Sequence, residues 1–210
     1  VPLGATVALT ITNPDADAKA TPGRPAIRPR ADWGSESPPN GTLRIIDDDL
    51  LIVHHTDAPE GAYQPSEVPT LIQAIFNFQT SGDLAWPDIG FNFIVDECGR
   101  IGGGRQGSID APVAGETEGG DPGHTQHVAF LGQFSAAPPT PLATEAMVSL
   151  LAWLANRDGV ATQPGDLTNF ISEGSDKFPA GEKVTVRTIA GHREIADVGC
   201  PGDPVMNDVV

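Results

Sequence analysis

The chain has 210 residues, of which 39% are hydrophobic and 19% are charged, so it is long enough to bury one good core. Its net charge of −16 argues against nucleic acid or an anionic membrane surface as a partner, because both are bound by clustered Lys and Arg. The longest apolar runs, such as residues 146–155, are too short to cross a bilayer, so we expect no membrane insertion.

The first part of the chain differs in composition from the rest. Residues 7–14 (VALTITNP) predict a strand, whereas residues 15–31 are rich in Ala, Pro and charge without hydrophobic periodicity, which is typical of a linker. We therefore expect residues 1–24 to be a strand of an upstream domain plus a linker, and residues 25–210 to form the main domain. Because the chain starts at Val1 without a signal peptide, we expect it to be a mature or trimmed form.

Three elements are predicted in the first half of the main domain. Residues 49–56 (DLLIVHHT) begin apolar and end polar, which predicts a buried strand that opens into a site, with the acidic run of residues 47–49 capping the turn before it. Residues 67–82 carry apolar side chains at helical spacing, from Leu71 to Phe78, and predict a helix with Ser66 as N-cap and Gly82 at its end. Residues 90–104 alternate and then turn near residues 97–99, which predicts a hairpin.

The second half continues the alternation of strands and helices. Residues 127–134 predict a strand, residues 171–184 have the composition of a loop, and residues 184–192 predict a strand that leads into the motif GHREIADVGCPGD. Residues 144–159 predict a helix with Thr144 as N-cap and Gly159 at its end. Its inward face would hold Met147, Leu150, Leu151 and Leu154. This order of elements predicts an α/β fold, a central sheet with helices packed against its faces.

Three residues at predicted strand ends form a candidate zinc site. His54, His192 and Cys200 offer two imidazole nitrogens and one thiolate, and a catalytic zinc uses three protein ligands with water in the fourth position. The spacing has neither the CxxC nor the HxxxH of a zinc finger. Taken alone, it leaves structural roles open, as well as a Cys200 nucleophile paired with His192. A serine triad is disfavoured because the chain has no GxSxG motif.

Five motifs occur in order and together resemble one known family. They are ADWGSE (31–36), LIVHHTDAP (51–59), IQAIFNFQTSGDLAWPDIGFNFIVDECGRI (72–101), HVAFLGQF (127–134) and TIAGHREIADVGCPGD (188–203). This set resembles the zinc-dependent N-acetylmuramoyl-L-alanine amidases that share a domain with peptidoglycan recognition proteins, and especially secreted actinobacterial members. The resemblance covers about residues 25–204.

The resemblance implies a fold, an activity and a ligand set. The family fold is a mixed β-sheet flanked by helices, with zinc in a groove at the strand ends, and its ligands fall on His54, His192 and Cys200. The implied reaction cleaves the lactyl amide between MurNAc and L-Ala, with peptidoglycan or muropeptides as partners and an extracytoplasmic or cell-wall location. By the same resemblance we assign substrate contacts to Thr56, Asn92 and Arg105, a packing or supporting role to His55, a structural ion pair or cap to Arg193, and a buried position to Cys98.

The sequence departs from the family at the positions that assist hydrolysis. The family's hydrolytic members carry Tyr where this chain has Phe91, and Lys or Thr where it has Val198, so two polar groups that act on the reacting oxygen are replaced. Glu116 stands where the family has His. One hypothesis is an amidase in which Glu116, His124, His127 or Tyr63 replaces the lost donor, although His124 and His127 lie in a loop-like run and are expected to be solvent-exposed. A second is a zinc-binding recognition module with slow or no hydrolysis, and a third is a scaffold with a vestigial site.

Overall fold

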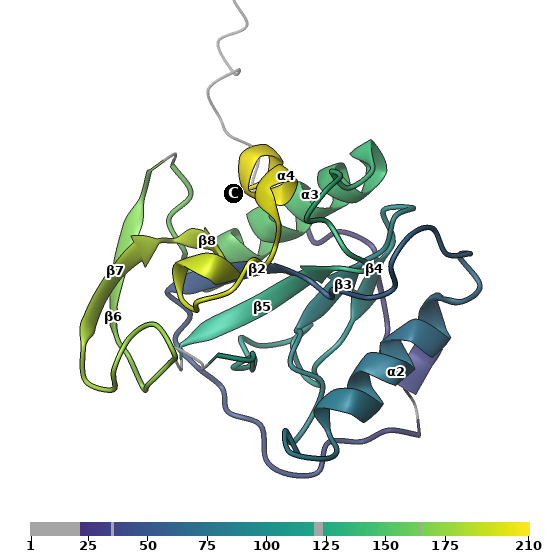
Figure 1. The fold of residues 1–210 in the computed structure, drawn as a ribbon, viewed down its shortest axis with the longest axis horizontal. Helices are drawn as coiled ribbons and strands as arrows, with labels where there is room; N and C mark the ends of the chain where they lie inside the picture. Colours follow the sequence, from purple (N-terminus) through teal and green to yellow (C-terminus); the bar gives the residue numbers. More distant parts are fainter. Residues whose placement is uncertain (1–21, 35, 120–123, 164) are drawn as a thin grey trace, which may run out of the picture.

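A six-stranded mixed sheet forms the centre of the protein (Figure 1). The computed structural model describes residues 22–34, 36–119, 124–163 and 165–210. The strand order is β1-β4-β3-β5-β2-β8, with β3 and β4 antiparallel and all other neighbours parallel, while β6 and β7 form a separate antiparallel hairpin. The strands are β1 (Ile27–Arg28), β2 (Leu50–His55), β3 (Phe93–Val95), β4 (Ile101–Gly103), β5 (Thr125–Phe130), β6 (Leu167–Ile171), β7 (Lys183–Arg187) and β8 (Ile189–Gly191).

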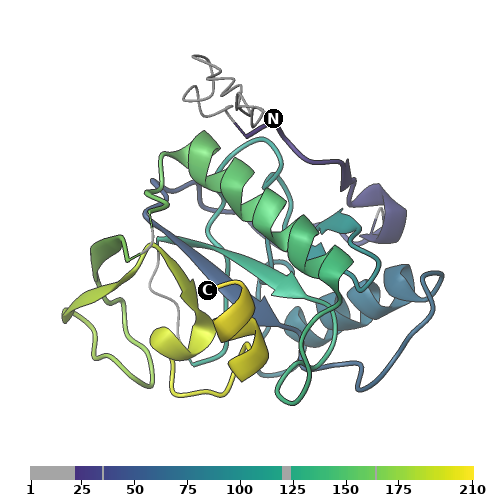
Figure 2. The same cartoon turned by 90° about the horizontal axis from the view of Figure 1, so that it is seen from above.

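Helices cover both faces of this sheet. The long helix α3 and the C-terminal α4 lie on one face, and α2 lies on the other (Figures 1 and 2). The helices are α1 (Ala31–Gly34), α2 (Val68–Gln79), α3 (Pro141–Asp158) and α4 (Asp203–Asp208), with a 3₁₀ turn η1 (His192–Glu194) after β8. The predicted α/β class, with a mixed sheet flanked by helices, is confirmed.

Side chains of strand β2 point alternately to the two faces of the sheet, and this places His54 at the candidate site. All six of its residues are buried, because the strand has neighbours on both sides and layers on both faces. Leu51 and Val53 pack with α3, while Leu50 and Ile52 pack with the β6–β7 hairpin on the opposite face. His54 continues the series of Leu50 and Ile52, so its ring emerges on the face that α3 leaves uncovered.

Both long helices were predicted, with shifted ends. Helix α3 begins after Thr140 rather than Thr144, because Thr140 Oγ1 accepts a hydrogen bond from the N–H of Ala143 and Pro141 takes the first helical position. It ends at Gly159 in the left-handed conformation, as predicted. Helix α2 is preceded by Glu67 rather than Ser66 and ends at Thr80. Its predicted apolar stripe is buried at Ile72 and Phe76, but Phe78 is 65% exposed.

Two further sequence predictions need correction, those for residues 184–192 and for residues 47–49. The strand predicted over residues 184–192 is two strands in different sheets, β7 and β8, and the first pairs with β6, which had not been predicted. In the acidic run of residues 47–49, Asp48 is buried instead of capping an exposed turn. The strand predicted over residues 7–14 lies outside the described residues.

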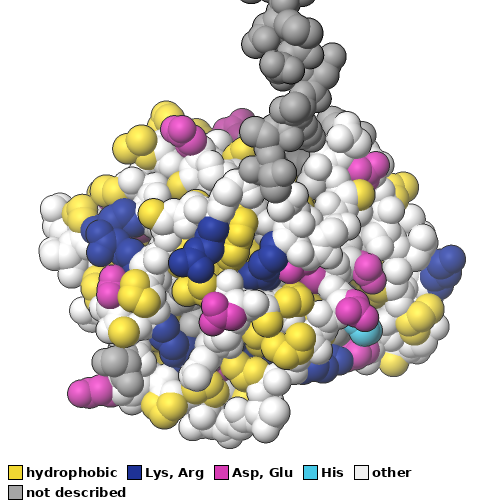
Figure 3. Space-filling model, turned by 180° about the vertical axis from the view of Figure 1, so that it is seen from behind, with side chains coloured by type: hydrophobic (Ala, Val, Ile, Leu, Met, Phe, Trp, Pro, Cys, Tyr) yellow, Lys and Arg dark blue, Asp and Glu magenta, His cyan; other side chains and the backbone are white. Residues whose placement is uncertain are grey.

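The surface carries charges of both signs. Figure 3 shows the face opposite to the view of Figure 1, where acidic and basic side chains are interspersed with apolar ones. Among the described residues, no helix is long and apolar enough to cross a membrane.

Candidate metal centre

The three predicted zinc ligands converge at one edge of the sheet. His54 is on β2, His192 starts the turn after β8, and Cys200 lies in the loop before α4. Because β8 pairs with β2 in the register Val53 with Gly191, the two histidines lie beside each other, with ring centroids 4.4 Å apart. One ligand atom from each of the three residues lies within 4.8 Å of the other two. Among the described residues, this is the one group of three or more His, Cys, Asp or Glu side chains that could hold a metal ion.

The spacing of these atoms suits zinc. Nδ1 of His54 is 3.7 Å from Sγ of Cys200. Bond lengths of about 2.1 Å to nitrogen and about 2.3 Å to sulfur, at a tetrahedral angle, place such atoms about 3.6 Å apart. Two nitrogens and one sulfur also form a donor set that zinc prefers. The residues present therefore fit the metal that the sequence predicted.

Hydrogen bonds hold the second nitrogen of each candidate ligand histidine. Nε2 of His54 lies 2.7 Å from Nδ1 of His127, and Nε2 of His192 lies 3.0 Å from both the carbonyl oxygen of Glu118 and Oγ1 of Thr117. Such outer partners fix the orientation and the tautomer of a metal-binding imidazole. Here they leave Nδ1 of His54 facing the cysteine.

Burial favours the neutral form of both histidines. It lowers the pKa of His54 well below its usual value, with a further contribution from His192 and His127, and it lowers the pKa of His192 to about 4. Burial also raises the pKa of the Cys200 thiol to about 12. Neutral imidazole is the form that binds a metal, whereas the thiol must lose its proton when it does so.

The loop that carries Cys200 is tied down by its neighbours. Arg193 donates to the carbonyl of Gly199 and pairs with Asp203, and its backbone N–H donates to the carbonyl of Cys200 over 2.9 Å. This confirms the structural ion pair predicted for Arg193. Gly191 packs closely against this loop and α4, since a Cβ there would lie 2.2 Å from Sδ of Met206 and 2.9 Å from Cδ of Pro201.

His55 supports the site without joining it. Its Nδ1 accepts a hydrogen bond from the N–H of Phe134 over 3.1 Å, while its backbone N–H donates to Sγ of Cys200 over 3.4 Å. The supporting role expected for His55 therefore agrees with its contacts.

A groove of about 720 Å³ opens above the three ligand residues. Helix α2 and Trp86 form an apolar wall, and the segment 116–118 carries acidic side chains into the groove. Lys and Arg are absent from its lining, as far as the described residues show. The lining includes Thr56, Asp57, Leu71, Ile75, Phe78, Trp86, Phe91, Glu116, Thr117, Glu118 and Val198 besides the ligand residues.

Four of the residues singled out in the sequence line this groove. Phe91 lies edge-on to the His54 ring at 5.4 Å between centroids, and Val198 is 36% exposed beside Cys200. Thr56 also lines the groove, although its hydroxyl is engaged with the carbonyl of Ala58 and the N–H of Gly132. Glu116 lines the groove; its Oε1 accepts a hydrogen bond from Arg105, and its Oε2 is buried without a hydrogen-bond partner among the described residues.

Two residues expected to contact substrate are buried instead. Asn92 has no exposed surface, and its amide bonds to Ser108, to the carbonyl of Val113 and to the N–H of His127, because it joins neighbouring segments below the groove. Arg105 is 4% exposed and is held by Glu116 and the carbonyl of Ile89. Neither side chain lines the groove.

Three other predictions about polar residues are corrected. His127, expected to be exposed, is completely buried behind His54, because the strand begins two residues earlier than predicted, at Thr125, and lies in the middle of the sheet. The Tyr63 hydroxyl bonds to the N–H of Glu97 and the carbonyl of Leu131, away from the groove. His124 is exposed, as expected, and lies near Glu173 rather than in the groove. Cys98, expected to be buried, is exposed because it lies at the tip of the β3–β4 turn.

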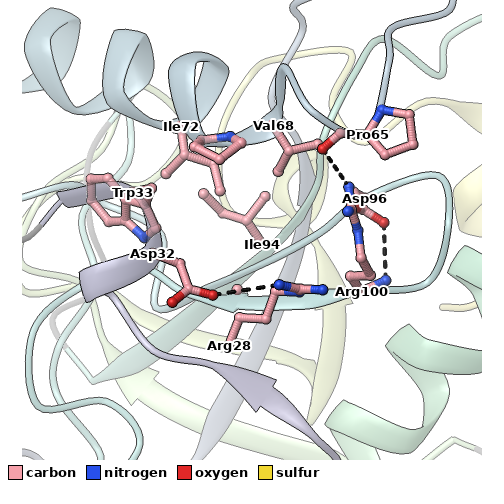
Figure 4. A pocket seen from close by; sticks show the side chains of 11 residues that line it. Arg28, Asp32, Trp33, Pro65, Val68, Ile72, Ile94, Asp96 and Arg100 are labelled. Atoms are coloured by element: carbon pink, nitrogen blue, oxygen red, sulfur yellow. Dashed lines mark hydrogen bonds and ion pairs between the residues drawn. The ribbon is translucent and has the colours of Figure 1, made fainter.

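A second, smaller cavity of about 170 Å³ lies between α1, α2 and β4 and shares no lining residue with the groove (Figure 4). Its charged side chains pair with near neighbours, Arg28 with Asp32 and Arg100 with Asp96 and the carbonyl of Pro65. Both arginines of this cavity thus already have partners. In the larger groove, by contrast, the candidate zinc ligands lie beside an open volume.

Comparison with known proteins places this site in a family. The family model described as N-acetylmuramoyl-L-alanine amidase matches residues 45–204. Peptidoglycan-recognition protein SC2 of Drosophila melanogaster is 23% identical over 182 residues, 86% of this chain and 82% of the relative. The N-acetylmuramoyl-L-alanine amidase of Homo sapiens is 26% identical over 191 residues, 88% of this chain but 28% of the relative.

Among solved structures, that of human PGRP-IβC in complex with glycosamyl muramyl pentapeptide has the same fold. It matches with a TM-score of 0.63 at 24% identity and covers 88% of this chain and 94% of that one. The sequence match spans His54, His192 and Cys200, and the two structures share the fold. The chain belongs to the N-acetylmuramoyl-L-alanine amidase family.

Proposed function

We propose that this protein is a zinc-dependent N-acetylmuramoyl-L-alanine amidase that cleaves the lactyl amide between MurNAc and L-Ala in peptidoglycan. The convergence of His54, His192 and Cys200 at the floor of an open groove is the observation that carries the proposal. When bound there, zinc would supply Lewis acidity toward the amide carbonyl and an activated water. Human PGRP-IβC, which shares the fold, binds a glycosamyl muramyl pentapeptide, and this supports muropeptides as the substrate class.

The groove can hold the two parts of such a substrate. The apolar wall of Leu71, Ile75 and Phe78 offers contact to sugar faces and alanine methyl groups, and Phe78 is free to do so because it is 65% exposed. The walls hold the scissile amide above the three ligand residues, which converts a bimolecular attack into a positioned one.

We assign the role of proton acceptor to Glu116. Its Oε2 is buried and has no hydrogen-bond partner among the described residues, while Arg105 holds the other oxygen at 3.1 Å, so a small rotation of the carboxylate would present an unpaired oxygen to the groove. A carboxylate accepts a proton from attacking water, but it does not replace the hydroxyl that Phe91 lacks. The proposed catalyst is therefore complete in metal ligands and base, and lacks the Tyr and Lys or Thr donors of its family.

A recognition module without hydrolysis is the second candidate. The observation that favours it is the apolar character of Phe91 and Val198, both of which line the groove next to ligand residues. Losing one oxyanion donor typically costs about a hundredfold to a thousandfold in rate. A site that lacks both donors would still bind zinc and muropeptide.

The test measures zinc content and release of free stem peptide from a muropeptide. The proposal predicts one zinc per chain and a release that stops with chelator and with Cys200→Ala. The matched control is Cys98→Ala, because Cys98 is the other cysteine and lies exposed in the β3–β4 turn. Muropeptide binding without cleavage would favour the recognition module, and absence of zinc from protein supplied with the metal would exclude both candidates.

A further inference from the structure

His127 is the unexplained residue closest to the candidate metal centre. It is completely buried on β5, on the strand next to His54, and does not line the groove. A buried imidazole is costly unless its nitrogens are paired. Both nitrogens are paired here, Nδ1 with Nε2 of His54 at 2.7 Å and Nε2 with Oγ1 of Thr125 at 2.8 Å.

We propose that His127 is a positioning residue that fixes the tautomer and the orientation of His54, so that Nδ1 of His54 is presented to the metal. This inference rests on the proposed zinc site and adds a residue to it. It concerns a row of three side chains, Thr125, His127 and His54, that run across two strands toward the groove.

The direction of the hydrogen bonds follows from the position of Cys200. Nδ1 of His54 faces Sγ of Cys200 at 3.7 Å, so Nδ1 must keep its lone pair to act as a ligand. The ring proton is then on Nε2 of His54, which donates to Nδ1 of His127. His127 in turn carries its proton on Nε2 and donates to the Thr125 hydroxyl.

The ring of His127 has no room to turn away. A Cβ on Gly115 would lie 2.2 Å from Cδ2 of His127, so the ring packs directly against that glycine. The backbone of His127 is also pinned, because its N–H donates to Oδ1 of Asn92 and its carbonyl accepts from the N–H of Asn92, both over 2.7 Å. Asn92 and Gly115 thus restrain His127, which in turn contacts His54.

Strand register explains why this residue can reach His54. Ile52 is the partner of His127 in the β2–β5 pair, and Ala129 is the partner of His54. The two histidines are therefore diagonal neighbours on the same face, and an imidazole spans that separation. A residue at position 127 with no acceptor near the place of Nδ1 would leave Nε2 of His54 without its partner.

The test combines two variants with two measurements. His127→Asn keeps an acceptor near the place of Nδ1, whereas His127→Leu removes it, and His124→Asn alters an exposed histidine as control. Long-range ¹H–¹⁵N spectra of the metal-free wild type should show His54 protonated at Nε2. Competition with a chromogenic chelator should show zinc affinity reduced about 10- to 100-fold in His127→Leu, largely restored in His127→Asn and unchanged in His124→Asn.

Two results would overturn the inference while leaving the zinc site intact. One is a wild-type spectrum with the His54 proton on Nδ1, and the other is equal zinc affinity in His127→Leu and wild type. If His127→Leu does not fold, the wild-type spectrum still decides the tautomer, and Thr125→Val should lower zinc affinity by weakening the orientation of His127. A wild type that binds no zinc would refute the proposed function, and the same spectrum would decide the His54 tautomer independently.

Discussion

The buried carboxylate of Asp48 should make the protein less stable as the pH rises. Asp48 is 6% exposed, its Oδ1 has no hydrogen-bond partner within the described part of the chain, and Nε2 of Gln126 donates to both its Oδ2 and Oδ2 of Asp158. Burial, together with the Asp158 charge, raises the pKa of Asp48 from 3.8 to about 7. Between these two values the folded state holds a proton that the unfolded chain has lost, so the unfolding free energy falls with rising pH.

The size of this change in unfolding free energy follows from the pKa shift of Asp48. About three pKa units correspond to a penalty of about 4 kcal/mol above pH 7, of which about 1.5–2 kcal/mol is already present at pH 5. Asp48→Asn cannot ionise, so it should gain about 2–3 kcal/mol more in unfolding free energy at pH 8 than at pH 5. A lost neutral hydrogen bond would lower both values equally.

Urea unfolding followed by Trp fluorescence at the two pH values measures this difference. The pKa shifts of the histidines also change the unfolding free energy in this pH range. Comparing each variant with wild type at the same pH cancels that contribution. Asp47→Asn is the matched control, since Asp47 is the exposed neighbour in the same acidic run and should show no pH-dependent gain. Equal effects of Asp48→Asn at pH 5 and pH 8 would refute the reasoning.

The remaining predictions concern the groove. Phe91→Tyr should raise kcat for muropeptide cleavage by up to about a hundredfold by restoring a hydroxyl beside His54, and an unchanged rate would mean that another donor already acts there. Glu116→Gln should lower kcat about a hundredfold without changing zinc content, and full activity in this variant would exclude the carboxylate as proton acceptor. Muropeptides with amidated stem carboxylates should bind about fivefold more tightly than free acids at low salt, because Asp57, Glu116 and Glu118 line the groove. Titration calorimetry at two salt concentrations checks this preference, which should shrink at the higher one.

Patterns within single segments predicted the fold well. The helical spacing around Ile72 and Leu150 and the alternation before Gly99 gave α2, α3 and the β3–β4 hairpin, because each depends on local burial. The N-cap of α3 is Thr140 rather than the predicted Thr144. Pro141 at the first helical position marks this start, and the sequence alone contains that signal. Strand β6 was missed since it pairs only with β7, and its alternation is weak.

The candidate site could be predicted only in part. The convergence of His54, His192 and Cys200 follows the family pattern, and the structure brings their donor atoms together. The burial of Asn92 could not be inferred, because its partners come from several distant segments. The pairing of His127 with Thr125 was available in principle, because the two residues stand two positions apart in TQHVAF, which places both polar side chains on one face of a strand.

The most direct test of the proposed activity identifies the bond that is cleaved. A muropeptide incubated with the zinc-loaded protein in ¹⁸O-water should yield a lactyl carboxylate with one ¹⁸O on MurNAc, and an unlabelled stem peptide with a free L-Ala amino terminus, as read by mass spectrometry. Label in the peptide would mean that a different bond is hydrolysed. An intact muropeptide that stays bound to the protein would contradict the amidase account.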